Sequence, residues 1–201
     1  MKTVRRRTIA VLAATCIALT GFGVSQASAG SASSSPFNGW TKGSFVSAVA
    51  KAGVFTAEQA AAAWGDQDKM STMPVSTSLE MVRATNDGIQ PMWSLPAAGT
   101  CKQKWINWLG VEMANLTVTL HWEFGTIGAI YMGTDATPWA KYAVGWSFAS
   151  FNGQEDYKNG LNWVTTRFAK FKFVDGNTSG TIWVRVTGYN DGSSSCQAGT
   201  P

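Results

Sequence analysis

The chain has 201 residues, 45% of them hydrophobic, which is enough to bury the core of one globular domain. Lys and Arg number 16 against 12 Asp and Glu, a formal net charge of +4, but four of the basic residues lie within positions 2–7. The rest of the chain carries twelve residues of each sign, so its zero net charge argues against a nucleic-acid-binding protein that works through overall basicity.

The first 29 residues have the three parts of a signal peptide. The basic positions 2–7 precede an apolar segment at 8–24, and Ala27-Ser28-Ala29 is a cleavage site of small residues. Arg6-Arg7 also allows a twin-arginine signal, but the residues that follow match that pattern poorly, so we prefer general secretion. No later segment approaches the roughly 18 consecutive apolar residues of a membrane-spanning helix. We therefore expect a secreted, extracellular protein with no integral membrane segment.

Two cysteines, Cys101 and Cys196, remain after removal of the signal peptide and Cys16. An even number of cysteines in an oxidising compartment, with no neighbouring histidine or second cysteine at metal-ligand spacing, predicts a disulfide. The bridge would close a loop of about 95 residues, for which the chain-entropy model gives roughly 4–5 kcal/mol of stabilisation. The same residue inventory argues against a metal site, and no cofactor is expected.

The segment 30–43 begins with a Gly/Ser/Ala run and is predicted to be flexible, and a helical hairpin is predicted over 44–65. Gly53 ends the first helix, and Thr56 with Gln59 forms the capping-box pattern that begins the second. Both helices are too short to be stable alone, so they must pack on something larger.

Residues 66–104 are predicted to be a turn-rich connection, because Pro and Gly recur and Asn86-Asp87-Gly88 is a turn signal; a short element is expected at 79–83. Alternating strands dominate a β-rich half at 105–193. The expected strands are 116–124, 144–150, 163–174 and 181–189. The fold class is therefore α+β and mainly β: one globular domain, 44–201, with a short N-terminal helical hairpin on an antiparallel β-sandwich or barrel.

Acid–base chemistry has one candidate pair. His121, the only histidine, and Glu123 point to the same face of the strand at 116–124, which suits either an acid/base pair or a solvated polar face. Glu155-Asp156 is predicted to lie in a turn, and no spacing selects a pair of catalytic carboxylates. The sequence therefore favours a protein without catalytic residues.

Ten tryptophans are the unusual feature of the composition. Trp122 and Trp146 share strand faces with Leu, Val and Phe and are predicted to be buried. Other indoles fall on polar faces or in a predicted loop, where they could stack on a sugar ring. The alternative is that the helical hairpin covers and buries them. The candidate ligand-binding residues are Trp139, Trp163, Arg167, Trp183 and Arg185.

Three fragments resemble a known group of proteins: LTVTLHWEFGTI at 116–127, GWSF at 145–148 and IWVRVTGYNDG at 182–192. They are similar to uncharacterised small secreted proteins of actinomycetes such as Streptomyces. The resemblance covers roughly residues 100–193 and implies a secreted β-domain, with no specific activity and no catalytic residue.

The sequence thus predicts a secreted, non-catalytic domain that binds an extracellular or cell-envelope ligand, with polysaccharide as the first candidate. Trp163 and Trp183 would stack on the ligand, and Arg167 and Arg185 would donate hydrogen bonds. Two alternatives stay open: a small secreted hydrolase that uses Glu123 and His121, and a protein-directed inhibitor or toxin.

Overall fold

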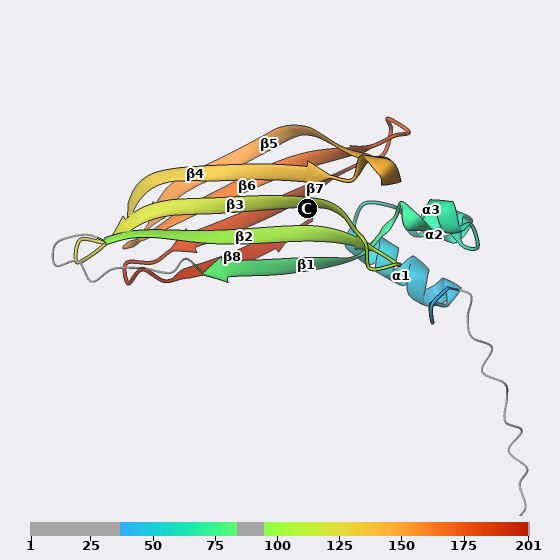
Figure 1. Ribbon diagram of the computed structural model, residues 1–201, viewed down its shortest axis with the longest axis horizontal. Coiled ribbons are helices and arrows are strands. Elements are labelled where there is room, and N and C mark those ends of the chain that lie inside the picture. The colour runs from blue at the N-terminus through green and yellow to red at the C-terminus, as the bar shows by residue number, and fades with distance from the viewer. Residues whose placement is uncertain (1–36, 84–94, 201) are drawn as a thin grey trace, which may run out of the picture. The chain divides into compact units, whose positions relative to one another are not determined.

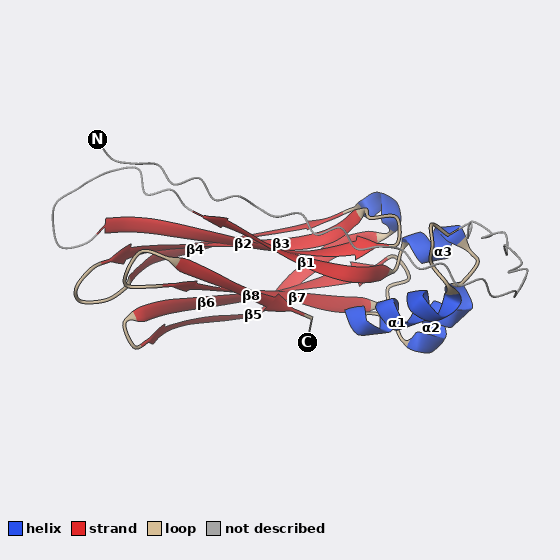
Figure 2. Ribbon diagram, turned by 90° about the horizontal axis from the view of Figure 1, so that it is seen from below, coloured by secondary structure: helices blue, strands red, loops and turns tan. Residues whose placement is uncertain are grey.

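Two antiparallel four-stranded sheets lie face to face in the computed structural model, which describes residues 37–83 and 95–200 (Figures 1 and 2). The described residues belong to one compact unit, Ser34–Pro201. The predicted signal peptide, residues 30–36 and the predicted turn Asn86-Asp87-Gly88 lie outside the described residues. The predicted class, mainly β with a few short helices, is confirmed, and the architecture is a sandwich.

Sheet A is formed by the first four strands in chain order, each antiparallel to the next. Its strands are β1 (Pro74–Arg83), β2 (Leu95–Asn107), β3 (Glu112–Phe124) and β4 (Ile130–Ala140). A short 3-10 helix, η1 (Tyr142–Val144), leads from β4 into the second sheet.

Sheet B contains the last four strands, again in chain order. They are β5 (Trp146–Asn159), β6 (Asn162–Phe173), β7 (Ser179–Gly188) and β8 (Ser194–Gly199). Across the sandwich, β3 packs against β7, β4 against β5 and β6, and β1 against β8.

The core lies between the sheets and follows from the two-residue period of the strands. Leu116, Val118 and Leu120 of β3 are fully buried, as are the facing Ile182 and Val184 of β7. The predicted burial of Trp122 and Trp146 is confirmed. Each of these two indole N–H groups donates to a backbone oxygen, of Tyr189 at 3.1 Å and of Thr72 at 2.9 Å.

The predicted disulfide is present. Cys101 of β2 and Cys196 of β8 are bonded, with their Cα atoms 5.7 Å apart. Because β2 belongs to sheet A and β8 to sheet B, the bond joins the two layers of the sandwich through its core.

Three helices gather at one end of the sandwich (Figures 1 and 2): α1 (Lys42–Ala52), α2 (Ala57–Ala63) and α3 (Gln67–Ser71). The predicted hairpin corresponds to α1 and α2, and the predicted capping box is present, since Gln59 N donates to Thr56 Oγ1 and Thr56 N to Gln59 Oε1. α1 packs against β1 and α2 against α1. The hairpin therefore covers an end of the sandwich, and the alternative in which it buries the polar-face indoles is wrong.

The prediction of a turn-rich connection at 66–104 was wrong, because this segment contains α3, β1 and most of β2. Two supposed turn residues have strand roles. Pro74 is the first residue of β1, where proline is tolerated. Gly99 lies within β2, where a Cβ would come within 2.7 Å of Ser194, so glycine here allows a close approach between the sheets.

Three further expectations were wrong because contacts with other parts of the fold set the local structure. Trp139 lies in β4 rather than in a loop, and Glu155-Asp156 lies in β5 rather than in a turn, because each segment pairs with a neighbouring strand. The described end of the segment 30–43 is ordered by contacts. The centroid of the Phe37 ring lies 4.8 Å from that of Trp64, and Lys42 and Gly43 belong to α1.

Candidate functional site

The five predicted ligand-binding residues lie on three different surfaces. Strand pairing places Trp163 and Arg167 on the inner face of sheet B, in register with Gly188 and Val184. It places Trp183 and Arg185 on the outer face of the same sheet. Trp139 lies on the outer face of sheet A, beside Asn115 of β3. The five residues therefore do not form one site.

Trp163 and Arg167 face the interior of the sandwich. The Trp163 ring stacks on Tyr131 of β4, with centroids 5.1 Å apart and planes inclined by 23°. Its indole nitrogen is buried. Arg167 is 9% exposed. Both side chains are thus used in packing between the sheets, which corrects the expectation that they line an open polar face.

The Arg167 guanidinium is neutralised by Asp156 of β5. Its two terminal nitrogens donate to the two carboxylate oxygens of Asp156, at 2.9 and 3.0 Å. Thr165 donates to the same carboxylate, and Thr134 of β4 donates to Thr165 at 3.2 Å. Buried charges are retained when paired and hydrogen-bonded in this way. The pair ties β5 to β6 and leaves no charge directed at a ligand.

The outer face of sheet B carries a row of residues that crosses all four strands: Gly153, Phe168, Trp183 and Gly199. A Cβ on Gly199 would lie 3.0 Å from Trp183 Nε1, and one on Gly153 would lie 3.1 Å from Phe168 Cδ2. The Trp183 ring therefore lies across the backbone of Gly199, an arrangement known from glycine-bearing sheets, and the Phe168 side chain lies close to Gly153.

Polar groups occupy the next row along the outer face: Glu155, Thr166, Arg185 and Gln197. Arg185 donates from Nε to Thr166 Oγ1 at 2.9 Å and from Nη2 to Glu155 Oε2 at 3.1 Å. Its guanidinium carbon lies 6.0 Å from the centroid of the Trp183 ring. The pair with Glu155 holds the guanidinium beside the indole, and its remaining N–H groups can donate to a ligand.

We name this surface the aromatic platform, defined by Phe168, Trp183 and the Arg185–Glu155 pair. Trp183 and Phe168 are half-buried. Tyr157 of β5 extends the surface by one further row and is 41% exposed. The platform combines aromatic side chains, hydrogen-bond donors and hydrogen-bond acceptors on the outer face of one sheet.

Trp139, 44% exposed, offers a weaker site on sheet A. The polar groups in its row are already engaged: Asn115 donates to Glu112, and Lys104 pairs with Glu80. The hydrogen bond that Lys104 donates to Glu80 raises the pKa of Lys104. No second aromatic ring is paired with Trp139 among the described residues of the neighbouring strand.

His121 and Glu123 lie on the outer face of sheet A, as the alternation predicted. His121 Nε2 is 3.0 Å from Asp135 Oδ2 of β4, a partner that the sequence did not indicate. The side chains of His121 and Asp135 are 45% and 79% exposed. The pair lies on open strand surface, where water is not excluded from a reacting group.

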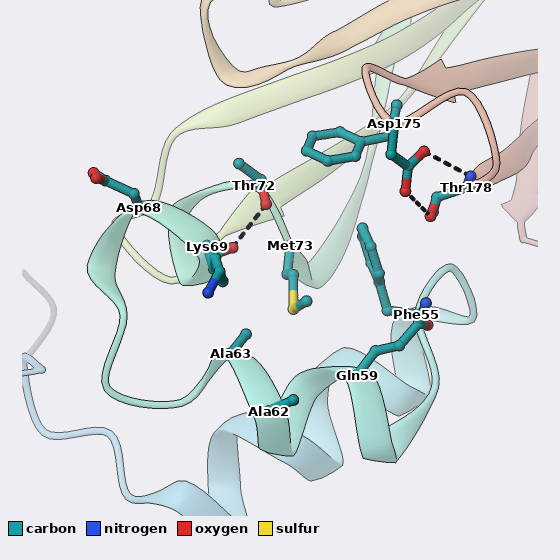
Figure 3. Close-up of a pocket in the computed structure, with 11 residues that line it drawn as sticks. Phe55, Gln59, Ala62, Ala63, Asp68, Lys69, Thr72, Met73, Asp175 and Thr178 are labelled. Atoms are coloured by element: carbon teal, nitrogen blue, oxygen red, sulfur yellow. Dashed lines mark hydrogen bonds between the residues drawn. The ribbon is translucent and has the colours of Figure 1, made fainter.

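A pocket of about 560 Å³ opens at the helical end of the sandwich, between α2, α3 and the turn that joins β6 to β7 (Figure 3). Phe55, Met73 and Phe173 give it an apolar lining, and Met73 points toward α2. The Phe55 and Phe173 rings have centroids 6.2 Å apart. The volume is within the range of small-molecule sites.

The polar residues around this pocket are engaged in local structure. Asp175 accepts hydrogen bonds from the Thr178 hydroxyl at 2.6 Å and from the backbone of Thr178 and Asn177, which lower the pKa of its carboxyl. Lys69 pairs with Asp66 at 2.9 Å. The pocket can take a small apolar group, but these contacts select no particular ligand.

Sequence reasoning missed the residues that complete these arrangements. Phe168, Gly153 and Gly199 join Trp183 only through the strand register, and Asp156 joins Arg167 in the same way. Glycine within a strand is the one available signal, because it indicates a close approach of another group.

No protein-family model, curated protein or solved structure matches the chain. In the described ranges 37–83 and 95–200, no helix has the length and apolar character that a bilayer crossing requires. The same ranges contain no group of three or more His, Cys, Asp or Glu side chains placed to hold a metal ion.

Proposed function

We propose that the protein is an exported binding domain for an extracellular or cell-envelope polysaccharide, and that the aromatic platform on sheet B is its binding surface. The observation that carries this proposal is the cross-strand row in which Phe168 and Trp183 lie over flanking glycines. Two aromatic side chains that are register partners on the outer face of one sheet suit the apolar face of a sugar ring.

The neighbouring polar row supports the same ligand class. Sugars present hydroxyl groups around the ring edge, and a binding site needs donors and acceptors next to the stacking surface. Arg185 and Glu155 supply both kinds of group within one row of Trp183. Their mutual ion pair fixes the side chains before a ligand arrives, which reduces the entropy lost on binding.

The export signal and the disulfide support the extracellular setting. The predicted signal peptide at 1–29 would direct the chain out of the cell, and the Cys101–Cys196 bond is of the kind that persists in oxidising compartments. A polysaccharide of the cell envelope or the surroundings is a ligand that such a protein would meet.

The test compares retention of wild type, Trp183→Ala and Trp139→Ala on insoluble polysaccharides, with chitin, cellulose and peptidoglycan as neutral and envelope-derived solids. We expect Trp183→Ala to lose at least about tenfold in affinity, as removal of a central aromatic contact does. Trp139→Ala is the matched control for loss of an exposed indole and should bind as wild type does. Equal binding by wild type and Trp183→Ala, or loss only in Trp139→Ala, would refute the platform as the site.

A further inference from the structure

The charges on the outer face of sheet B are not balanced. Along β6, Lys170 and Lys172 continue the outward series that contains Phe168, since they alternate with the buried Ala169 and Phe171. Neither lysine forms an ion pair with another residue in the described part of the chain. Their strand neighbours on this face are uncharged: Ser150 and Thr181 beside Lys170, and Ser147 and Ser179 beside Lys172.

Sheet A provides the contrast. Lys102 and Lys104 also point outward from one strand at alternate positions, but each meets a carboxylate. Lys102 Nζ is 3.1 Å from Glu112 Oε1, and Lys104 pairs with both Glu80 and Glu112. The outer lysines of sheet A are therefore neutralised in place, whereas those of sheet B leave two positive charges next to the aromatic platform.

We infer that the platform selects an acidic polysaccharide, one that carries carboxylate or sulfate groups on its sugars; this inference rests on the proposed function. Successive outward residues of a strand are about 7 Å apart, so Lys170 and Lys172 lie one and two such steps from Phe168 along β6. One sugar stacked across Phe168 and Trp183, in a polymer that runs parallel to β6, would place the anionic groups of its neighbours over Lys170 and Lys172. Arg185 lies on the other side of the rings with its charge already paired to Glu155.

The chemistry of a lysine side chain suits the binding of anionic groups by Lys170 and Lys172. A lysine ammonium is a mobile point charge with three donors, which suits an anionic group whose position varies along a polymer. The chain outside the predicted signal peptide has no net charge, so its attraction to a polyanion must come from a local group of residues such as this one.

The experiment measures affinity for soluble polygalacturonate, dextran sulfate and neutral dextran at low and high salt. The proteins are wild type, Lys170→Ala/Lys172→Ala and a control, Lys42→Ala/Lys69→Ala, which removes the same charge from exposed positions of α1 and α3. We expect wild type to prefer an acidic polymer and the preference to shrink with salt. Loss of the two sheet B lysines should weaken acidic-polymer binding roughly fivefold to tenfold, and the control should not change it. The two acidic polymers identify the anion.

The outcomes separate this inference from the proposed function. Trp183-dependent binding that is equally strong for neutral and acidic polymers would overturn the inference and leave the platform as the site. An equal loss in both double variants would also overturn it, because the effect would then be one of net charge. No binding to any polymer here and to any solid above, or acidic-polymer binding that survives Trp183→Ala unchanged, would refute the proposed function itself.

Discussion

Neighbouring strands of sheet B carry the same two residue types and use them in opposite ways. In β6, Trp163 and Arg167 face the interior, where a ring stack and an ion pair to Asp156 hold them. In β7, Trp183 and Arg185 face outward, and Arg185 pairs with Glu155. A Trp and an Arg at short spacing on one strand face are therefore packed between the sheets in β6, whereas in β7 they belong to the surface that we propose binds the ligand.

The largest expected difference between the two faces is in their ion pairs. Asp156→Ala removes the carboxylate that pairs with the buried Arg167 guanidinium, which keeps only the Thr165 and Thr166 oxygens as acceptors, and should lower the free energy of unfolding by about 3 kcal/mol. Glu155→Ala, one residue away on the outer face, should cost at most about 1 kcal/mol, because its pair is exposed. Urea denaturation of both variants checks this, and equal losses would show that the two faces are not distinct.

Removal of the inward-facing indole should also cost more stability than removal of the outward-facing one. Trp163→Ala is expected to destabilise the protein by about 3 kcal/mol, the lower end for a large aromatic, since Trp163 is only half-buried. Trp183→Ala should cost less, because Trp163 packs against the core whereas Trp183 lies on the outer face of the sheet. Ligand binding per folded molecule should show the opposite order. A Trp163→Ala variant that keeps full stability but loses binding would reverse our assignment of the two faces.

Two glycines of sheet B allow a finer comparison. A Cβ on Gly188 would lie 2.6 Å from the buried Trp122 ring, whereas one on Gly199 would lie 3.0 Å from the partly exposed Trp183. Gly188→Ala should therefore cost about 1–3 kcal/mol by overpacking. Gly199→Ala should cost less and instead tilt the indole, weakening polysaccharide binding. Thermal unfolding and binding assays on the two variants separate these effects, and equal thermal shifts would contradict the account.

The smallest expected effect is on the stability of the protein in acid, and it concerns Glu112 on the outer face of sheet A. Although burial favours its protonated form, hydrogen bonds from Lys102 and Asn115 hold the pKa of Glu112 below its ordinary value of 4.5. A lowered pKa means that this carboxylate stabilises the fold above pH 4.5 and that the contribution disappears as the pH falls through the lowered value. Glu112→Gln should reduce the loss of stability between pH 5 and lower pH by less than about 1 kcal/mol. Denaturant curves across that range provide the check; an unchanged acid profile would show that Glu112 contributes nothing to it.

The sequence was sufficient for the features that depend on local period. Alternation identified β3, β6 and β7, the capping residues identified α2, and the cysteine count identified the disulfide. It was not sufficient for the face of Trp163, because Thr165 and Arg167 made an interior face look solvated. Their burial depends on Asp156 and Thr134, which come from other strands.

The platform depends on register in a way that no single strand reveals. Phe168 meets Gly153 only because β5 shifts register twice before that point. Of β1, only the part at 79–83 was anticipated as a short element, because Ser and Thr dilute the apolar residues of the strand and prolines stand at strand starts. Pairing with a neighbour, rather than local preference, makes these segments strands.

The most direct test of the account is a nitrogen–proton correlation spectrum of the indole groups, recorded while polygalacturonate is added and assigned with Trp183→Phe. We expect the Trp183 signal to shift, while the signals of Trp163 and Trp122 stay in place. Shifts confined to Trp139, or shifts of Trp163 with Trp183 unaffected, would contradict the central claim that the outer face of sheet B is the binding surface.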